Sequence, residues 1–356
     1  MQLPTLLLCA AGALLMQPRG LGQRGLDSTP SGSIEIRALI DATAEGAATQ
    51  WFGVHDSVMG GVSRGAVREG ERGVQFAGQM SLENNGGFAS FRTRVDGAMT
   101  ADADGLRLRV RGDGQNWKLS LRGGSELSWQ APFATAAGGW TTIDLPFSAL
   151  VPSFRGRFIA DAPTFDPATL GEVGLVIADG QAGEFMLELD SIEAWRAERN
   201  APQPGSLAAQ TAAMESLATR LESGLDAAGL LEALRWKQRL LVVCEPLARG
   251  SLDKRTSLQL GRFFANTPQL ARRDLCVVQL LGERGARVAG RTLDAETTRA
   301  LRREWSMPAS SWGLALIGKD GGVKARWSDA VGPAEVYRRI DAMPMAREEQ
   351  RDRADS

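Results

Sequence analysis

The fold is decided by residues 51–93, which read WFGVHDSVMGGVSRGAVREGERGVQFAGQMSLENNGGFASFRT. Two short sequence motifs, or words, in this stretch favour tight turns: HDSVMGG at residues 55–61 and NNGG at residues 84–87. Paired glycines supply backbone positions at positive φ, and Asp and Asn side chains can bond their own main chain. A short strand is expected between the two words, near Phe76. The stretch therefore predicts two structurally demanding loops between strands, and it contains no recognisable catalytic constellation.

Further short words follow these loops in order along the chain. They are RGDG at 111–114, LPF at 145–147, FRGR at 154–157 and IAD at 177–179. Together with Trp51, DSVMGGV at 56–62 and NNGGFASFR at 84–92, they resemble the signature of the complex I intermediate-associated protein family over about residues 40–197. The resemblance implies a galactose-binding-like, jelly-roll β-sandwich. It also implies a non-catalytic role, because the mitochondrial members of that family act as assembly factors for respiratory NADH:ubiquinone oxidoreductase.

Length and composition describe an ordinary globular chain. With 356 residues the chain is long enough for two domains. Its hydrophobic content of 43% and charged content of 23% are typical of folded proteins. The formal net charge is −1, and the arginines alternate with acidic residues rather than forming one basic block. No nucleic-acid partner is therefore expected.

The N-terminal residues predict a targeting signal for export. Residues 3–16 form an apolar run that is shorter than the ~20 residues needed to span a bilayer. Small residues at positions 20 and 22 would allow cleavage before Gln23, so residues 1–22 are predicted to be a signal peptide and no membrane span is expected after cleavage. The protein would then be periplasmic or extracellular. A mitochondrial presequence is the alternative, because Arg19, Arg24 and Arg37 precede or flank few acids.

Strand patterns dominate residues 34–198, which are predicted to form the sandwich, after a flexible lead-in at 23–33. The runs LRLRVR at 106–111 and WKLSLR at 117–122 alternate apolar and polar residues, which predicts a hairpin. Residues 148–171 are expected to be a crossover loop. Further strands are predicted at 141–145, 174–178 and 184–195. In the last of these the apolar face changes parity at Asp190, which predicts a β-bulge.

Residues 199–234 are predicted to be a linker and a helix, with Ser206 as the helix cap. Residues 235–345 then show the element order βαβαββα, which is typical of a thioredoxin-like domain. Words at 272–275, 316–322 and 340–345 also resemble an uncharacterised family assigned to that fold. Residues 346–356 are predicted to be a charged, disordered tail. The predicted strands are 240–244, 274–280, 314–317 and 323–327, and the predicted helices are 253–265, 294–305 and 333–343.

Enzymatic chemistry is not predicted in either domain. A thioredoxin-like oxidoreductase would carry C-x-x-C at about residues 249–252, and this chain has RGSL there. Cys244 and Cys276 lie inside apolar strands, where a thiol behaves as a small buried hydrophobe. His55 is the one histidine of the chain, and no G-x-S-x-G word accompanies it. We therefore expect no cofactor and no thiol–disulfide activity.

What remains is binding, and the expected role is a non-catalytic, assembly-assisting protein of the cell envelope with a protein partner. A carbohydrate-binding module and a mitochondrial complex I assembly factor proper are the alternatives. Trp129 and Trp140 are further rings that could stack on a sugar, with core packing as the rival interpretation. A structural calcium ion held by Asp56, Asn85 and Asp113 is a further alternative. The candidate binding residues are Trp51, His55, Asp56, Asn84, Asn85, Asp113, Trp117 and Arg155.

Overall fold

The first sheet of the sandwich is antiparallel and is built around one long strand, β13 (Gly183–Ala197). Along one edge β13 pairs first with β4 and then with β1, and along the other it pairs with β6. The register shifts between Leu189 and Ser191, which confirms the predicted bulge. The other strands of this sheet are β1 (Ile34–Asp41), β3 (Arg64–Glu69), β4 (Val74–Met80), β6 (Gly105–Gly112) and β9 (Trp140–Pro146).

The structure is a computed structural model, which describes residues 34–159, 162–198, 203–246, 252–282 and 285–354. The predicted signal peptide and lead-in lie outside these residues. Within them, no helix is both long and apolar enough to cross a membrane.

The second sheet faces the first across a core that contains Phe76 and Leu108 from one side and Phe91 and Leu119 from the other. Its strand order is β11-β10-β8-β7-β12-β5-β2. The strands are β2 (Phe52–His55), β5 (Ala89–Arg94), β7 (Asn116–Arg122), β8 (Ser128–Ala134), β10 (Val151–Phe154), β11 (Arg157–Phe158) and β12 (Glu172–Ile177). Among the described residues, short 3-10 helices connect the strands of the two sheets: η1 (Ala47–Gln50), η2 (Asp56–Met59), η3 (Glu83–Asn85), η4 (Gly97–Met99), η5 (Phe147–Ala149) and η6 (Pro167–Thr169).

Two local predictions for the sandwich are wrong. Strands β6 and β7 do not form a hairpin, because β6 lies in the first sheet and β7 in the second. Both strands bury the apolar residues of one face, so their alternation is the same whether they pair with each other or with different neighbours. Residues 148–171 are not a plain crossover loop, since they contain β10 and β11. These strands are too short to give a periodic signal.

The second region is α/β, which confirms the predicted fold class of a β-sandwich followed by an α/β region. In its sheet β14 is parallel to β15 and antiparallel to β18, and β18 is antiparallel to β19. The hairpin β16–β17 extends the sheet on the β15 side and was not predicted. The strands are β14 (Arg239–Glu245), β15 (Leu275–Leu281), β16 (Gly285–Val288), β17 (Arg291–Leu293), β18 (Gly313–Ile317) and β19 (Val323–Trp327).

The helices of this region begin at capping residues that the sequence makes recognisable. Ser206 accepts a hydrogen bond from the backbone N–H of Ala209 at 3.1 Å, as predicted for the first helix. Asp253 and Asp294 cap the starts of α3 and α5 in the same way. The helices are α1 (Leu207–Glu222), α2 (Ala227–Leu234), α3 (Lys254–Phe264), α4 (Thr267–Ala271), α5 (Ala295–Glu304), α6 (Pro333–Asp341) and α7 (Pro344–Ala354).

The C-terminal residues correct the prediction of a disordered tail. Helix α7 covers most of that segment, and Glu349 on it accepts hydrogen bonds from Lys319 Nζ at 2.7 Å and Arg239 Nη1 at 3.0 Å. The side chain of Arg239 is almost fully buried. The charge-rich composition of this segment indicated disorder, but the segment forms a helix that supplies the counter-ion of a buried arginine.

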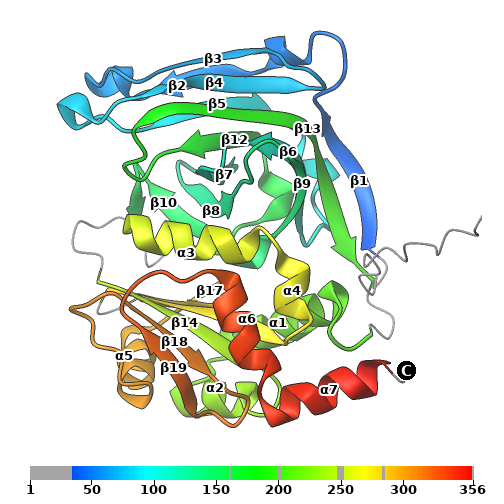
Figure 1. The fold of residues 1–356 in the computed structure, drawn as a ribbon, viewed down its shortest axis with the longest axis vertical. Helices are drawn as coiled ribbons and strands as arrows, with labels where there is room; N and C mark the ends of the chain where they lie inside the picture. Colours follow the sequence, from blue (N-terminus) through cyan, green and yellow to red (C-terminus); the bar gives the residue numbers. More distant parts are fainter. Residues whose placement is uncertain (1–33, 160–161, 199–202, 247–251, 283–284, 355–356) are drawn as a thin grey trace, which may run out of the picture. The chain divides into compact units, whose positions relative to one another are not determined.

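Helix α3 joins the two regions. It packs against β7 and β8 of the sandwich, and Figure 1 shows it lying between the sandwich and the α/β sheet. The hydrophobic cluster of the sandwich continues without a break into Leu260 and Phe263 on this helix. Thr267 Oγ1 also donates a hydrogen bond to the backbone oxygen of Asp144. The two regions therefore share one hydrophobic core.

Candidate functional site

One buried carboxylate ties together the two turn-forming loops of residues 55–61 and 84–87. Asp56 opens η2 directly after β2 and has no exposed surface. Its carboxylate accepts hydrogen bonds from the backbone N–H of Ser63 at 3.0 Å and of Gly87 at 2.6 Å. The hydroxyl of Ser63 donates to the same carboxylate. The loops are therefore held in one fixed arrangement by a single side chain.

The four glycines of these loops are required for two different reasons. Gly60 and Gly87 have φ of 90° and 126°, which confirms that the loops contain positions at positive φ. Gly61 and Gly86 do not. A Cβ on Gly61 would lie 2.4 Å from Asp56 Cγ, and one on Gly86 would lie 2.5 Å from Asp56 Oδ2. These two positions must be glycine because the carboxylate is packed against the backbone.

The hydrogen bonds also determine the charge state of Asp56. Burial alone raises its pKa, but the hydrogen bonds from the Ser63 hydroxyl and from the backbone N–H groups of Gly87, Ser63 and Phe88 outweigh this effect. The pKa of Asp56 therefore lies below the ordinary value for Asp, and the group is ionised at neutral pH. Its role is architectural.

Two further candidates complete this assembly. Asn84 adopts φ of 54°, and its Nδ2 donates to the backbone oxygen of Gly60 at 3.2 Å, which links the loops a second time. His55 Nε2 lies 3.1 Å from the backbone oxygen of Gly65, and its ring packs edge-on against Phe91 with centroids 5.4 Å apart. His55 is therefore an anchor between β2 and β3. Asn85 ends η3, and its side chain lies outside the described part of the chain.

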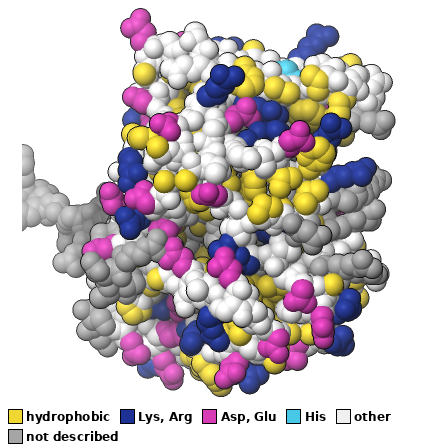
Figure 2. Space-filling model, turned by 180° about the vertical axis from the view of Figure 1, so that it is seen from behind, with side chains coloured by type: hydrophobic (Ala, Val, Ile, Leu, Met, Phe, Trp, Pro, Cys, Tyr) yellow, Lys and Arg dark blue, Asp and Glu magenta, His cyan; other side chains and the backbone are white. Residues whose placement is uncertain are grey.

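The joined loops present apolar side chains to solvent. Val58 and Met59 on η2 are 71% and 70% exposed, and Val62 and Leu82 beside them are 42% and 47% exposed. We call these four residues the apolar loop surface. Figure 2 shows hydrophobic side chains gathered on the sandwich region in this view. Sequence reasoning missed this surface, although valine and methionine inside a turn-forming word, where polar residues are usual, were a signal for it.

The predicted tryptophans do not form a binding surface. Trp51, Trp117 and Trp129 are 7%, 0% and 4% exposed, and Trp51 packs edge-on against Phe76 in the core. Trp140 is half-buried, and the guanidinium groups of Arg72, Arg109 and Arg111 lie over its ring. The core interpretation is correct for Trp51, Trp117 and Trp129. Trp51 and Trp117 are thereby removed as binding candidates.

The two remaining candidates lie apart from the loops. Asp113 accepts hydrogen bonds from the backbone N–H groups of Gln115 at 3.0 Å and Met186 at 2.7 Å. Arg155 is exposed in the turn between β10 and β11, with φ of 49°, and lies over the ring of Phe154. The structure therefore does not bring the eight predicted residues into one site.

The set proposed for calcium is not assembled either. Asp56 and Asp113 bond to different neighbours, and the oxygens of Asp56 are already occupied by hydrogen-bond donors. Within the described residues, no three His, Cys, Asp or Glu side chains are grouped so that they could hold a metal ion.

The fold and the loops define a protein with a β-sandwich followed by an α/β region. Residues 40–189 match the family model for Complex I intermediate-associated protein 30 (CIA30), and residues 230–349 match the model for a Domain of unknown function (DUF4174). This match confirms, over the sandwich region, the family resemblance that the sequence motifs indicate.

Curated relatives share a part of the chain. The Sushi repeat-containing protein SRPX of Homo sapiens is 32% identical over 126 residues, which are 35% of this chain and 26% of that protein. The protein SRPX2 of Mus musculus is 29% identical over 127 residues, with 35% and 26% covered. This chain thus spans about a quarter of the length of these relatives.

Solved structures resemble the fold at low sequence identity. A family 11 carbohydrate-binding module of a Clostridium thermocellum cellulase has a TM-score of 0.38 and 12% identity, covering 47% of this chain and 99% of that chain. An exo-beta-agarase has a TM-score of 0.31 and 9% identity, covering 54% and 31%. These likenesses concern the fold alone.

Proposed function

We propose that the chain is a non-catalytic, assembly-assisting protein that binds another protein through the apolar loop surface. The observation that carries this proposal is the exposure of Val58 and Met59 on loops that are fixed by a buried carboxylate. Exposed apolar side chains that lie together mark interaction sites in soluble proteins. The partner would contribute an apolar patch of its own, because the four residues offer no charge for recognition.

The rigidity of the loops supports a binding role. Association costs the free energy of ordering loops at the interface, and a loop that is already ordered avoids much of this cost. Here Asp56, Ser63, Gly87 and Asn84 hold the backbone beneath the apolar side chains. A surface of this kind can bind a partner without rearrangement of its backbone.

A protein partner is favoured over a carbohydrate by the state of the tryptophans. Sugar-binding surfaces commonly use the flat face of an exposed aromatic ring. Three of the four tryptophans that were candidates to stack on a sugar are buried, and arginines lie over the ring of the fourth, Trp140. Carbohydrate binding and a mitochondrial assembly role are therefore the secondary hypotheses.

We further propose that the α/β region has a thioredoxin-like fold that has no redox function and acts as a structural platform. Its strand order β15-β14-β18-β19, with one parallel and two antiparallel pairs, supports this. Residues 247–251, where a redox motif would begin, lie outside the described part of the chain, but their sequence contains no cysteine.

Export is part of the same proposal, and it rests on the apolar run at residues 3–16. The mature protein should begin near Gln23 and lack Cys9. N-terminal sequencing of protein from its native source measures this directly. An intact Met1 in a cytosolic fraction would contradict export, and recovery in mitochondria would favour the alternative localisation.

Affinity capture with a matched variant tests the binding surface. The full chain, the double variant Val58→Ser/Met59→Ser and the control Val323→Ser would each be used as bait, since Val323 is 38% exposed on β19. All three should melt alike, because the altered side chains are exposed. A protein recovered with the wild type and the control, but not with the double variant, is the expected result. Glycan-array binding that the double variant retains, with no such protein, would favour the carbohydrate hypothesis instead.

A further inference from the structure

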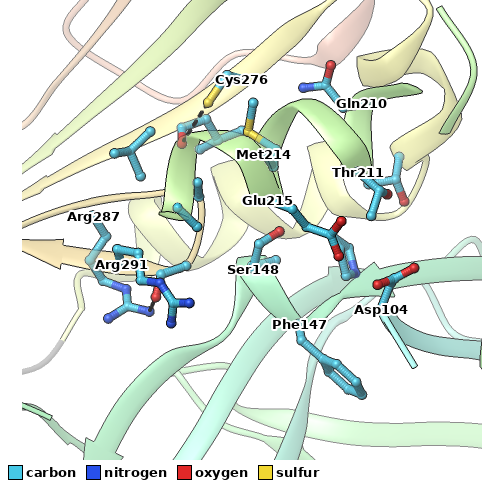
Figure 3. A pocket seen from close by; sticks show the side chains of 18 of the residues that line it. Asp104, Phe147, Ser148, Gln210, Thr211, Met214, Glu215, Cys276, Arg287 and Arg291 are labelled. Carbon is cyan, nitrogen blue, oxygen red and sulfur yellow. Dashed lines mark hydrogen bonds between the residues drawn. The ribbon is translucent and has the colours of Figure 1, made fainter. Parts of the chain in front are cut away.

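A cavity of about 290 Å³ lies where the sandwich meets the α/β region, away from the apolar loop surface. It is bounded by η5 of the sandwich, by α1, and by β15 and the β16–β17 hairpin of the α/β region. Its walls are largely apolar. Figure 3 shows Phe147 and Met214 on different sides of it, with Arg287 and Arg291 together at one end. Such a cavity has the size and the mixed lining of a small-molecule site.

At the arginine end of the cavity, Arg287 carries a positive charge that no described carboxylate neutralises. Arg287 is 6% exposed and donates to Thr292 Oγ1 at 2.8 Å and to the backbone oxygens of Leu150 at 2.7 Å and Gly290 at 2.9 Å. All three partners are uncharged, and no carboxylate of the described chain pairs with this guanidinium. Burial, with Arg291 nearby, lowers the pKa of Arg287 to about 10. A buried cation without a counter-ion is costly.

Two more polar groups at this end have unused hydrogen-bonding capacity. Gln279 lies directly opposite Arg287 in the β15–β16 pair, so both side chains are on the same face of the sheet. Gln279 is 5% exposed, and its Oε1 is buried without a hydrogen-bond partner in the described structure. Arg291 pairs with Glu222 at 2.7 Å, while its buried Nε has no partner among the described groups. A bound anion would pair with Arg287 and accept a hydrogen bond from Arg291 Nε, and the Gln279 amide can turn its NH₂ toward it.

The other end of the cavity has the opposite character. Asp104 and Glu215 line it, and Figure 3 shows them on the far side of Ser148 from the two arginines. The carboxylate of Asp104 already accepts the backbone N–H of Ala197 at 2.7 Å. A ligand anion would therefore be attracted to the arginine end, where Arg287 has no described counter-ion, and this attraction fixes the orientation of the ligand.

We infer that this cavity binds a small organic carboxylate with an apolar body. Its carboxylate would lie against Arg287, Arg291 and Gln279, and its body would lie along Phe147 and Met214. The ligand would supply the counter-ion that the fold leaves out, and it would bridge the two regions of the chain.

Calorimetric titration of the full chain with four probes tests the ligand class: octanoate, 1-octanol, octylamine and acetate. Octanoate should bind at least tenfold more tightly than each of the other three, because it alone combines the anion with an apolar body. Equal binding of octanol or octylamine would overturn the inference, and so would the absence of octanoate binding.

The variant Gln279→Glu separates ligand binding from folding. It places a carboxylate opposite Arg287 at nearly unchanged volume, so that the protein supplies its own counter-ion. The variant should melt at or above the wild-type temperature and bind octanoate at least tenfold more weakly. Arg291→Gln should also weaken octanoate binding, whereas Arg299→Gln, an exposed arginine of α5, should not. Wild-type affinity in both Gln279→Glu and Arg291→Gln would overturn the inference.

Discussion

Gly86 illustrates at the residue scale why a glycine can be required without unusual backbone geometry. Its place is set by Asp56 Oδ2, which would lie 2.5 Å from a Cβ. Gly86→Val should therefore destabilise the protein by about 1–3 kcal/mol, the usual cost of overpacking. Thermal melts of the full chain measure this. Gly139→Val is the matched control, because nothing lies within 4 Å of its Cβ position, and equal melting of the two variants would show that the loop packing is not critical.

Asp56 also predicts a dependence of stability on pH. The folded pKa lies below the value of about 3.9 in the unfolded chain. A depressed folded pKa stabilises the protein at every pH above the unfolded value, and this contribution is lost as the pH falls through the folded pKa. Asp56→Asn should lower the free energy of unfolding at neutral pH by about 1–3 kcal/mol, since a buried hydrogen-bond network loses its charge.

The difference between wild type and Asp56→Asn should shrink as the pH is lowered below about 4, where the carboxylate of the wild type becomes protonated. Urea unfolding at a series of pH values measures both curves. Ser57→Ala, next to Asp56 and exposed, is the control and should follow the wild type. A constant difference between Asp56→Asn and wild type down to acid pH would contradict the proposed ionisation of Asp56.

At the scale of elements, the sequence predicts those parts whose signal is local. The strand 240–244 and the helices that begin at Ser206 and Asp253 are found close to their predicted places, because apolar runs and caps are local features. The pairing of β6 with β13 and β9 was not predictable, since alternation reports which face is buried and not which strand is adjacent. The apolar loop surface depends on Asp56 reaching Gly87, which is 31 residues away in the sequence.

The cysteines on strands β14 and β15 should show no thiol chemistry, because both are buried. Cys244 and Cys276 are free and buried. Burial raises the pKa of Cys276 to about 12, and it raises that of Cys244 although the guanidinium of Arg302, 2.9 Å from its Sγ, opposes the shift. Since the thiolate is the reactive form, both residues should react slowly with a thiol reagent at pH 8 and appear on denaturation.

An insulin-reduction assay with dithiothreitol adds a functional measurement to thiol labelling. The full chain should not accelerate the reaction above the uncatalysed rate. Cys244→Ser is the matched variant, because Cys244 lies at the end of β14 that leads toward α3. Turnover by the wild type that Cys244→Ser abolishes would make the α/β region an enzyme.

Helix α7 predicts that part of the charged C-terminal segment contributes to stability. Burial raises the pKa of Glu349, but hydrogen bonds from Lys319 and Arg239 lower it below its ordinary value, so the carboxylate is the charged partner of a buried arginine. Glu349→Gln should cost about 1.5–3 kcal/mol, the range for hydrogen bonds to charged groups. Glu348→Gln, on an exposed neighbouring residue, should cost little. Chemical denaturation measures both, and equal effects would mean that α7 does not dock as the structure shows.

At the scale of the whole molecule, two family domains that follow each other in sequence share one core. The cluster that fills the sandwich extends through α3 to Leu241, Leu314 and Leu316 of the α/β sheet. Two domains joined in this way should unfold together, because neither can expose its side of α3 without losing buried apolar surface. The cavity with Arg287 lies in the same contact region, so a ligand bound there would stabilise both domains at once.

Replacing Gly261 on α3 by alanine tests this coupling, because the direction of the change in melting temperature depends on whether α3 packs against the sandwich. In an exposed helix, replacing Gly by Ala stabilises by about 1 kcal/mol. Here a Cβ would lie 2.1 Å from Asn116 Oδ1 on β7, so Gly261→Ala should instead lower the melting temperature. Tryptophan fluorescence and helical circular dichroism should report the same lowered midpoint, because the two regions unfold as one. Gly139→Ala, with open space around it, is the control. A raised midpoint, or a shift in one signal alone, would show that α3 does not join the two regions.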